Sequence, residues 1–142
     1  MKGSKDILSS ILKTTQMGQI GIRSILKNNL ESNLRNELNS QLREYDTIES
    51  EAHGIAISRG WELKELDPAI KSMTNMMTRT RLSFGNANSK AAAMMIQGNT
   101  RGIIKGFKNL NQFQSDDKAV MNLAQKLLDF EDANNRQLQG FL

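Results

Sequence analysis

The longest helical pattern in the chain is LRNELNSQLREYDTIESEAHGIAISRGW, residues 34–61. Its apolar positions return every three or four residues, which is the period of an α-helix that buries one face. Glycine adopts the left-handed conformation that closes a helix C-terminus, so the pattern predicts that this helix ends at Gly60. The predicted buried stripe consists of Leu34, Leu38, Leu42, Tyr45, Ile48, Ala52, Ile55 and Ala56.

Apolar residues also recur every three or four positions before residue 34 and after residue 61. The pattern predicts a first helix with Ser4 as its N-cap and with its end near Asn28 and Asn29. Asp67 and Pro68 predict the start of a third helix, because Asp accepts hydrogen bonds from free N–H groups and Pro has no N–H to satisfy. This third helix is expected to end at Gly85.

Two more helices are expected before the chain ends. Asn88 or Ser89 is the predicted N-cap of a fourth helix, and Ser115, followed by Asp116 and Asp117, starts a fifth. Short connections make successive helices antiparallel. The predicted fold is therefore all-α, an antiparallel bundle of about five helices.

Composition limits the alternatives. The chain has 142 residues, of which 38% are hydrophobic and 24% charged, as expected for a single folded domain over residues 1–142. It contains no cysteine, which suits a reducing compartment. The longest apolar run, residues 91–96, is much shorter than a membrane span, and no signal-peptide hydrophobic region is present. We expect a cytoplasmic protein with no membrane partner.

The net charge of +4 comes from the middle of the chain, where residues 68–115 contain basic residues and no acidic ones. Cations scattered over solvated helix faces explain such a segment, and an anion or nucleic-acid binding surface is the alternative. The side chains that would form that surface are Lys90, Arg101, Lys105 and Lys108.

Residues for catalysis or metal binding are scarce. A di-iron site in a helical bundle needs glutamates from all four helices and a Glu-x-x-His pair from two of them. His53 is the only histidine, and the third and fourth predicted helices contain no Asp, Glu or His. We therefore expect no metal, no cofactor and no enzymatic activity, and we expect His53 to be a partner of Glu49. A metal enzyme would need a site around Glu49, His53 and Glu131.

Gly98, Gly102 and Gly106 recur every four residues on one face of the fourth predicted helix. Each glycine in a helix interior costs about 1 kcal/mol relative to alanine, so a compensating close approach of another helix is expected. The contact is either a crossing within the chain or a subunit interface, and we favour self-association. The glycines are expected beside an apolar arc formed by Ala92, Met95, Ile103 and Phe107.

The end of the second predicted helix, with Glu49, Ala52, Arg59, Gly60 and Trp61, resembles the ferritin-like bundles of the spore coat protein F group. The resemblance covers roughly residues 5–65, and this chain has Glu62 where that group usually has an aromatic residue. It implies a ferritin-like four-helix bundle in which the third helix is a short crossover between two helix pairs. It also implies a structural role without catalysis.

The resulting hypothesis is a non-enzymatic helical-bundle protein that self-associates or joins a larger protein assembly, with a role similar to that of a spore coat protein. The alternative is an anion or nucleic-acid binding module that uses the basic middle segment. The two are distinguished by whether the cations of that segment converge on one surface.

Overall fold

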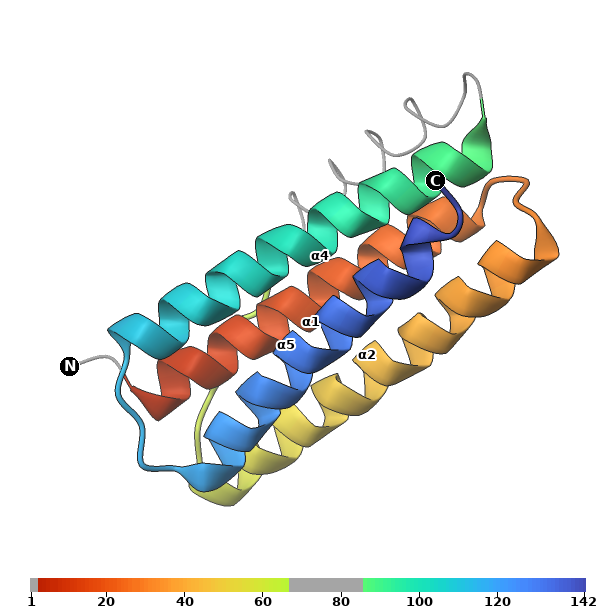
Figure 1. Ribbon diagram of the computed structural model, residues 1–142. Helices are drawn as coiled ribbons and strands as arrows, with labels where there is room; N and C mark the ends of the chain where they lie inside the picture. Colours follow the sequence, from red (N-terminus) through yellow and green to blue (C-terminus); the bar gives the residue numbers. More distant parts are fainter. Residues whose placement is uncertain (1–2, 67–85) are drawn as a thin grey trace.

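The computed structural model describes residues 3–66 and 86–142, and this part of the chain is all-helical, with no strand (Figure 1). The expected third helix and its start at Asp67 and Pro68 lie outside the described residues. The four helices are α1 (Ser4–Leu26), α2 (Ser32–Arg59), α4 (Ala87–Gln112) and α5 (Lys118–Gln139). The prediction of an all-α bundle is confirmed.

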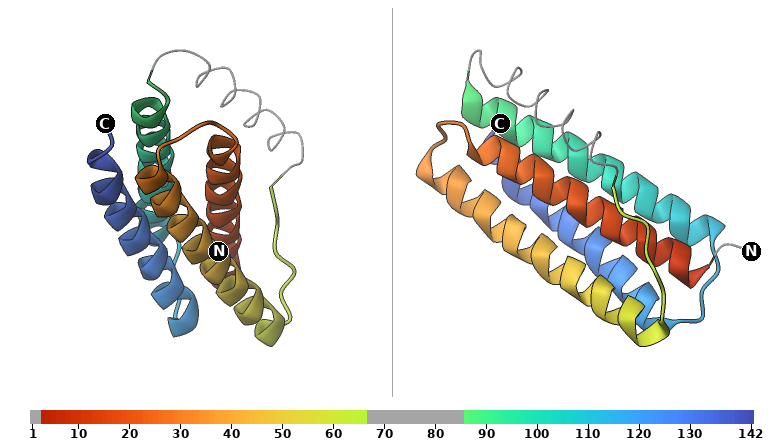
Figure 2. Two further views of the ribbon diagram at one scale, coloured as in Figure 1. Left: turned by 90° about the vertical axis from the view of Figure 1, so that its right-hand side faces the viewer. Right: turned by 180° about the vertical axis from the view of Figure 1, so that it is seen from behind.

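The helices form two antiparallel pairs, α1 with α2 and α4 with α5 (Figures 1 and 2). The pairs contact each other through α1 and α4 and through α2 and α5. At one end Arg59 of α2 forms an ion pair with Asp117 before α5, and at the other end the Glu31 N–H donates to Asn88 of α4. Helices α2 and α4 therefore run in the same direction.

Several helix ends differ from the predictions by a few residues. Helix α1 begins at Ser4 itself, after Gly3, and its first turn is closed by the Asp6 carboxylate, which accepts from the Gly3 N–H at 3.0 Å. The N-cap of α4 is Asn86, which accepts from the Ser89 N–H. Asn88 is not the cap because its side chain is used for the contact with Glu31.

The predicted stop at Gly60 is confirmed. Gly60 has φ of 68°, in the left-handed region that glycine adopts without strain. The Trp61 N–H donates to the Ala56 carbonyl at 2.9 Å, and the indole packs half-buried against the core at this end of α2. This is the closing turn expected of a C-terminal glycine.

The core follows a seven-residue repeat in each helix, with buried positions separated alternately by three and four residues. We call these inward-facing positions of a helix its seam. In α4 the seam consists of Ala92, Met95, Asn99, Gly102 and Gly106. The expected arc through Phe107 is wrong, because that side chain is 53% exposed. Polar and small residues occupy the seam where an apolar pattern was predicted.

Candidate functional site

The middle of the bundle contains a layer of buried polar side chains, one from each of α2, α4 and α5. Tyr45 of α2 lies with its hydroxyl 3.0 Å from Asn99 Oδ1 of α4 and 2.9 Å from Glu131 Oε2 of α5. All three are almost completely buried, with Asn99 at 1% and Glu131 at 2% exposure. Phe130 supports the Tyr45 ring edge-on, with ring centroids 4.8 Å apart. We call Tyr45, Asn99 and Glu131 the polar layer.

Two glycines provide the space for these side chains. A Cβ at Gly18 of α1 would lie 2.4 Å from Tyr45 Cζ, and a Cβ at Gly102 of α4 would lie 2.6 Å from both carboxylate oxygens of Glu131. Side chains at these positions would occupy the volume that the ring and the carboxyl group fill. All four helices therefore contribute to the polar layer, α1 by the absence of a side chain.

The environment of the polar layer favours neutral groups. Burial raises the pKa of Glu131 to about 8, and the hydrogen bond from Tyr45 opposes this shift less strongly. Burial, followed by the Glu131 charge, raises the pKa of Tyr45 well above its usual value. At neutral pH both groups are therefore predominantly protonated.

Counting hydrogens supports the same protonation state. The Tyr45 hydroxyl has one hydrogen and lies within hydrogen-bond distance of two oxygen atoms. When it donates to Asn99 Oδ1, the contact with Glu131 Oε2 needs a second hydrogen, which a protonated carboxyl group supplies. The Tyr45 hydroxyl is thus placed to donate to Asn99 Oδ1 or to Glu131 Oε2, and a neutral Glu131 can donate to Tyr45 while Tyr45 donates to Asn99.

The polar layer leaves two buried atoms without a partner, Glu131 Oε1 and Asn99 Nδ2. An unpaired polar atom in a protein interior costs about 1–3 kcal/mol, so a ligand or an ordered water is expected to contact it. Both residues line a cavity of about 400 Å³ between α1 and α4. This volume lies in the range of small-molecule sites.

The cavity has three chemically distinct parts. Its floor is the polar layer, its walls are apolar, and cationic side chains reach it from α1 and α4. The cations are Lys13, Arg101 and Lys105, and none of them takes part in an ion pair within the described part of the chain. The apolar walls include Met17, Ile25, Leu66, Met94 and Met95.

Only part of the predicted anion-binding set reaches this cavity. Arg101 and Lys105 line it, while Lys90 and Lys108 do not, and Lys13 was not predicted. Lys90 is half-buried and Lys108 is exposed on α4. A sequence pattern within one helix could not identify Lys13, because it belongs to α1.

The predicted glycine stripe divides between two environments. Gly102 and Gly106 face α5, where added Cβ atoms would lie 2.6 Å from Glu131 and from Leu128. A Cβ at Gly98 would meet no atom within 4 Å. The close approach at Gly102 and Gly106 is therefore a helix crossing within the chain, whereas a subunit contact at Gly98 stays a prediction.

His53 does not join Glu49. The Glu49 carboxylate accepts from Gln19 of α1 at 3.4 Å, and among the described residues no hydrogen bond links it to half-buried His53. Residues 3–66 and 86–142 contain no group of three or more His, Cys, Asp or Glu side chains that could hold a metal ion. The expected absence of metal stays a prediction that elemental analysis can test.

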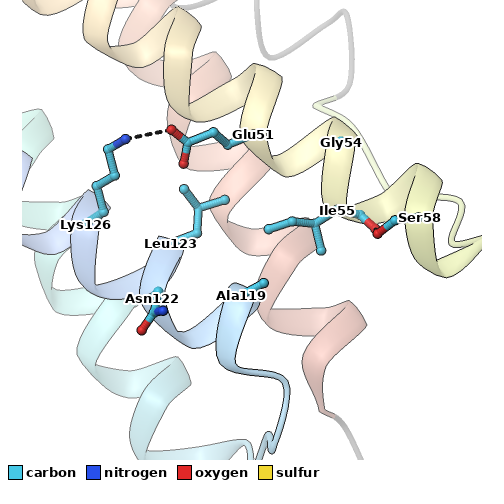
Figure 3. A pocket seen from close by; sticks show the side chains of 8 residues that line it. All are labelled: Glu51, Gly54, Ile55, Ser58, Ala119, Asn122, Leu123 and Lys126. Carbon is cyan, nitrogen blue, oxygen red and sulfur yellow. Dashed lines mark hydrogen bonds and ion pairs between the residues drawn. The ribbon is translucent and has the colours of Figure 1, made fainter.

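A second groove of about 400 Å³ lies between α2 and α5 (Figure 3). Its charged side chains, Lys126 and Glu51, neutralise each other in an ion pair of 2.6 Å across the groove. None of its lining residues has a buried side-chain atom that lacks a partner. We therefore place the candidate site in the cavity between α1 and α4.

Over residues 3–66 and 86–142 the fold and the site define an all-helical bundle of four helices with a polar layer in its core. No protein-family model matches the sequence, and no curated protein matches it. Solved structures with this fold include a DUF305 fragment from Deinococcus radiodurans, with a TM-score of 0.77 and 12% identity over 99% of this chain and 95% of that one. The E. coli stress protein YciF has a TM-score of 0.61 and 13% identity, covering 99% of this chain and 94% of that one.

YcfI, described as a putative structural protein from Rhodopseudomonas palustris, has a TM-score of 0.60 and 16% identity, with coverage of 98% and 94%. At these identities the likeness concerns the fold alone. No helix in the described part of the chain is long and apolar enough to cross a membrane.

Proposed function

We propose that the protein is a non-enzymatic, cytoplasmic binding protein whose cavity between α1 and α4 takes a small molecule with an apolar body and one anionic group. The observation that carries this proposal is the cavity of about 400 Å³, which has apolar walls and cations that form no ion pair with any described residue. The cysteine-free composition supports a reducing compartment.

The distribution of charge supports an anionic ligand. Lys13, Arg101 and Lys105 come from two helices and line the same cavity. The one acidic residue among the described lining residues is Glu131, whose raised pKa keeps it largely neutral near pH 7. The local field therefore attracts an anion, and the apolar walls contribute burial energy of about 25 cal/mol for each Å² of covered surface.

The same geometry favours a small ligand over nucleic acid. An extended polyanion needs a row of cations along an open surface. Two of the four predicted cations, Lys90 and Lys108, lie outside the cavity lining. The remaining two are grouped with Lys13 around a partly open cavity, which fits a single charged group better than a phosphate backbone.

Calorimetric titration with decanoate and with uncharged decanol tests the proposal. We expect saturable binding of decanoate to the parent protein and weaker binding to a variant carrying Arg101→Ala and Lys105→Ala. Lys108→Ala is the matched control, because Lys108 is exposed on α4 outside the cavity. Absence of saturable decanoate binding, or equal losses in the double variant and the control, would overturn the proposal.

Assembly is a second candidate function, including the coat-like role that the Gly60 and Trp61 resemblance implies. It is supported by two large apolar side chains on the outside of α4, Ile104 at 50% and Phe107 at 53% exposure. Exposed apolar residues close together on a helix favour contact with another protein surface. A homo-oligomer formed through α4 is the simplest such contact.

Sedimentation equilibrium tests the second candidate. If α4 forms a subunit interface, Phe107→Ser should reduce the oligomer to a monomer. Ile57→Ser provides the control, because Ile57 is 81% exposed on α2. A monomeric parent protein, or dissociation in both variants alike, would exclude an interface at Phe107.

A further inference from the structure

The cavity between α1 and α4 is elongated along the two helices. Its lining on α1 runs from Lys13 to Ile25, and its lining on α4 runs from Lys105 back to Met94. Because an α-helix rises about 1.5 Å per residue, the lining extends for about 16–18 Å. A volume of about 400 Å³ spread over this length favours an elongated ligand over a compact one.

Two contacts define the register of α1 and α4, which lie side by side (Figure 2) and run in opposite directions. Near one end of the pair the Asn109 side chain donates to the Ser10 hydroxyl. Further along, a Cβ at Gly21 would lie 3.9 Å from Met95 Sδ. Both helices rise equally per residue, so Gly98 of α4 lies within about one turn of the level of Gly21.

The same register gives the cavity two chemically different ends. Lys13 and Lys105 lie at about the same level, with Arg101 one turn further along α4, and these residues form the cationic end. Ile25 and Met94 lie near each other at the opposite end, which is apolar. An anionic group and an apolar chain therefore belong at different ends of the cavity.

Two glycines on facing helices lie between these ends, Gly21 on α1 and Gly98 on α4, and both line the cavity. Glycine is less favourable than alanine in a helix interior. Gly102 is required by the close approach of Glu131, but a Cβ at Gly98 would meet no atom within 4 Å. The Cβ at Gly21 would make only an ordinary contact with Met95, at 3.9 Å. Packing against described residues therefore explains neither Gly21 nor Gly98, whereas an open cavity at this level does.

The position of Gly98 on its helix directs an added side chain towards the cavity. Gly98 shares a face of α4 with Met94, Arg101 and Lys105, which are separated from it or from each other by three or four residues and all line the cavity. A long side chain at this position would therefore occupy the space between the cationic end and the apolar end.

We infer that the ligand is an unbranched alkyl chain with one terminal anionic group, and that it lies lengthwise in the cavity and passes between Gly21 and Gly98. Its anionic group lies at the cationic end, and its far end reaches Ile25 and Met94. Gly98 is then a specificity-determining residue, because its missing side chain sets the chain length that the cavity accepts. This inference rests on the proposed function, because it specifies the shape and orientation of the same ligand.

Calorimetric titration of the parent protein and of Gly98→Met with hexanoate and dodecanoate tests the inference. The helix from Lys105 to Gly98 is about 10 Å long, so hexanoate ends before the glycines and dodecanoate extends past them. In the parent protein each added methylene should tighten binding about fourfold. In Gly98→Met, hexanoate should keep its affinity within about twofold, and dodecanoate should lose at least about tenfold, the effect of roughly two methylenes left unburied.

Gly54→Met is the matched control. Gly54 is also an exposed glycine inside a helix, a Cβ there would meet no atom within 4 Å, and it lines the groove between α2 and α5. This variant should leave both affinities unchanged. Methionine favours a helix more than glycine does, so neither variant should unfold at a lower temperature than the parent protein. Thermal unfolding shows that a loss of binding is not a loss of folding.

The outcomes separate the inference from the proposed function. Binding of neither acid to the parent protein contradicts the proposed function itself. If the parent protein binds both acids and Gly98→Met keeps the same preference for dodecanoate, the proposed function stands and the inference is overturned. An equal loss of both acids in Gly98→Met, or the same change in Gly54→Met, also overturns it, because Gly98 then does not select chain length.

Nuclear Overhauser effects between bound dodecanoate and the parent protein test the orientation without any variant, and so decide the question even if Gly98→Met does not fold. We expect contacts from the terminal methyl group of the ligand to the methyl groups of Ile25 and Met94. Contacts from that methyl group to the Lys13 side chain, or none to Ile25 and Met94, would overturn the inference.

Discussion

Replacing Glu131 by glutamine isolates the effect of one buried carboxyl group on stability. The glutamine amide has nearly the same shape, and like a protonated carboxyl group it can either accept from Tyr45 or donate to it. It cannot ionise. We therefore expect Glu131→Gln to fold like the parent protein and to lose the part of the pH dependence that Glu131 causes.

The sign and size of the effect follow from the two pKa values. Glu131 has a pKa of about 8 in the folded protein, against 4.5 for an unperturbed glutamate. Below pH 4.5 the group is protonated in both states. As the pH rises towards 8 the unfolded chain releases this proton and the folded protein retains it, so stability falls by about 1.4 kcal/mol for each pH unit. The loss is about 3 kcal/mol by pH 7 and ends near pH 8.

Urea denaturation followed by circular dichroism, repeated between about pH 5 and pH 9, measures this effect. The difference in unfolding free energy between Glu131→Gln and the parent protein should grow with pH up to about 8 and then level off. Glu44→Gln serves as a control, because it removes an exposed carboxylate next to Tyr45 in the sequence. Comparing two glutamine variants cancels the contributions of the other titrating groups.

Parallel stability curves for Glu131→Gln and the parent protein would refute this reasoning. They would mean that Glu131 is ionised in the folded protein at neutral pH. The hydrogen-bond chain would then run the other way, with the Asn99 amide turned to donate to Tyr45 and Tyr45 donating to Glu131.

Three further predictions concern packing, capping and metal content. Gly102→Ala should lower the unfolding free energy by about 1–3 kcal/mol, because the added Cβ would displace the hydrogen-bonded Glu131 carboxyl group. Gly98 lies one turn earlier on α4, and a Cβ there meets nothing within 4 Å. Gly98→Ala should therefore raise the unfolding free energy by up to about 1 kcal/mol. Thermal unfolding of both variants measures the contrast, and equal shifts would contradict the crossing. Asp117→Ala should cost about 1 kcal/mol in urea unfolding, because the carboxylate accepts from the Ala119 and Val120 N–H groups and pairs with Arg59; an unchanged midpoint would argue against the cap. The purified protein should contain only trace iron and zinc by elemental analysis, and stoichiometric metal lost in His53→Ala would prove this wrong.

The all-helical fold was predictable because apolar periodicity carries most of the information about helix packing. Leu34, Leu38, Tyr45 and Ile48 follow the period in α2 and are all buried. Gly60 ends this helix through backbone chemistry that the residue type alone indicates. Such features are local, so a single sequence contains them.

The polar layer was not predicted, although the sequence contains a signal for it. The alternating spacing of three and four residues continues in α5 through Leu127, Glu131, Asn134 and Leu138, which are all buried. A search for apolar residues alone does not find Glu131 in α5 or Asn99 in α4. Both residues are found when every position at the alternating spacing is assigned to the core, whatever its residue type.

The cavity and its cations could not be predicted from one sequence. Lys13 and Arg101 belong to helices that are distant in the chain, and they line one cavity only because α1 packs beside α4. Four cations spaced along one segment suggested a continuous surface. Lys108 shares a face of α4 with Arg101 and Lys105 but lies further along the helix, outside the cavity lining, and no pattern within the segment specifies where along the helix the cavity ends.

The crystal structure of the protein with α-bromodecanoate is the most direct test of the proposed binding site. The bromine atom lies next to the carboxylate, so its anomalous signal locates the charged end of the ligand. We predict one strong anomalous peak at the cavity between α1 and α4, beside Lys13, Arg101 and Lys105, with the chain extending towards Glu131. A peak in the groove between α2 and α5, or no peak at a saturating concentration of the ligand, would contradict the assignment.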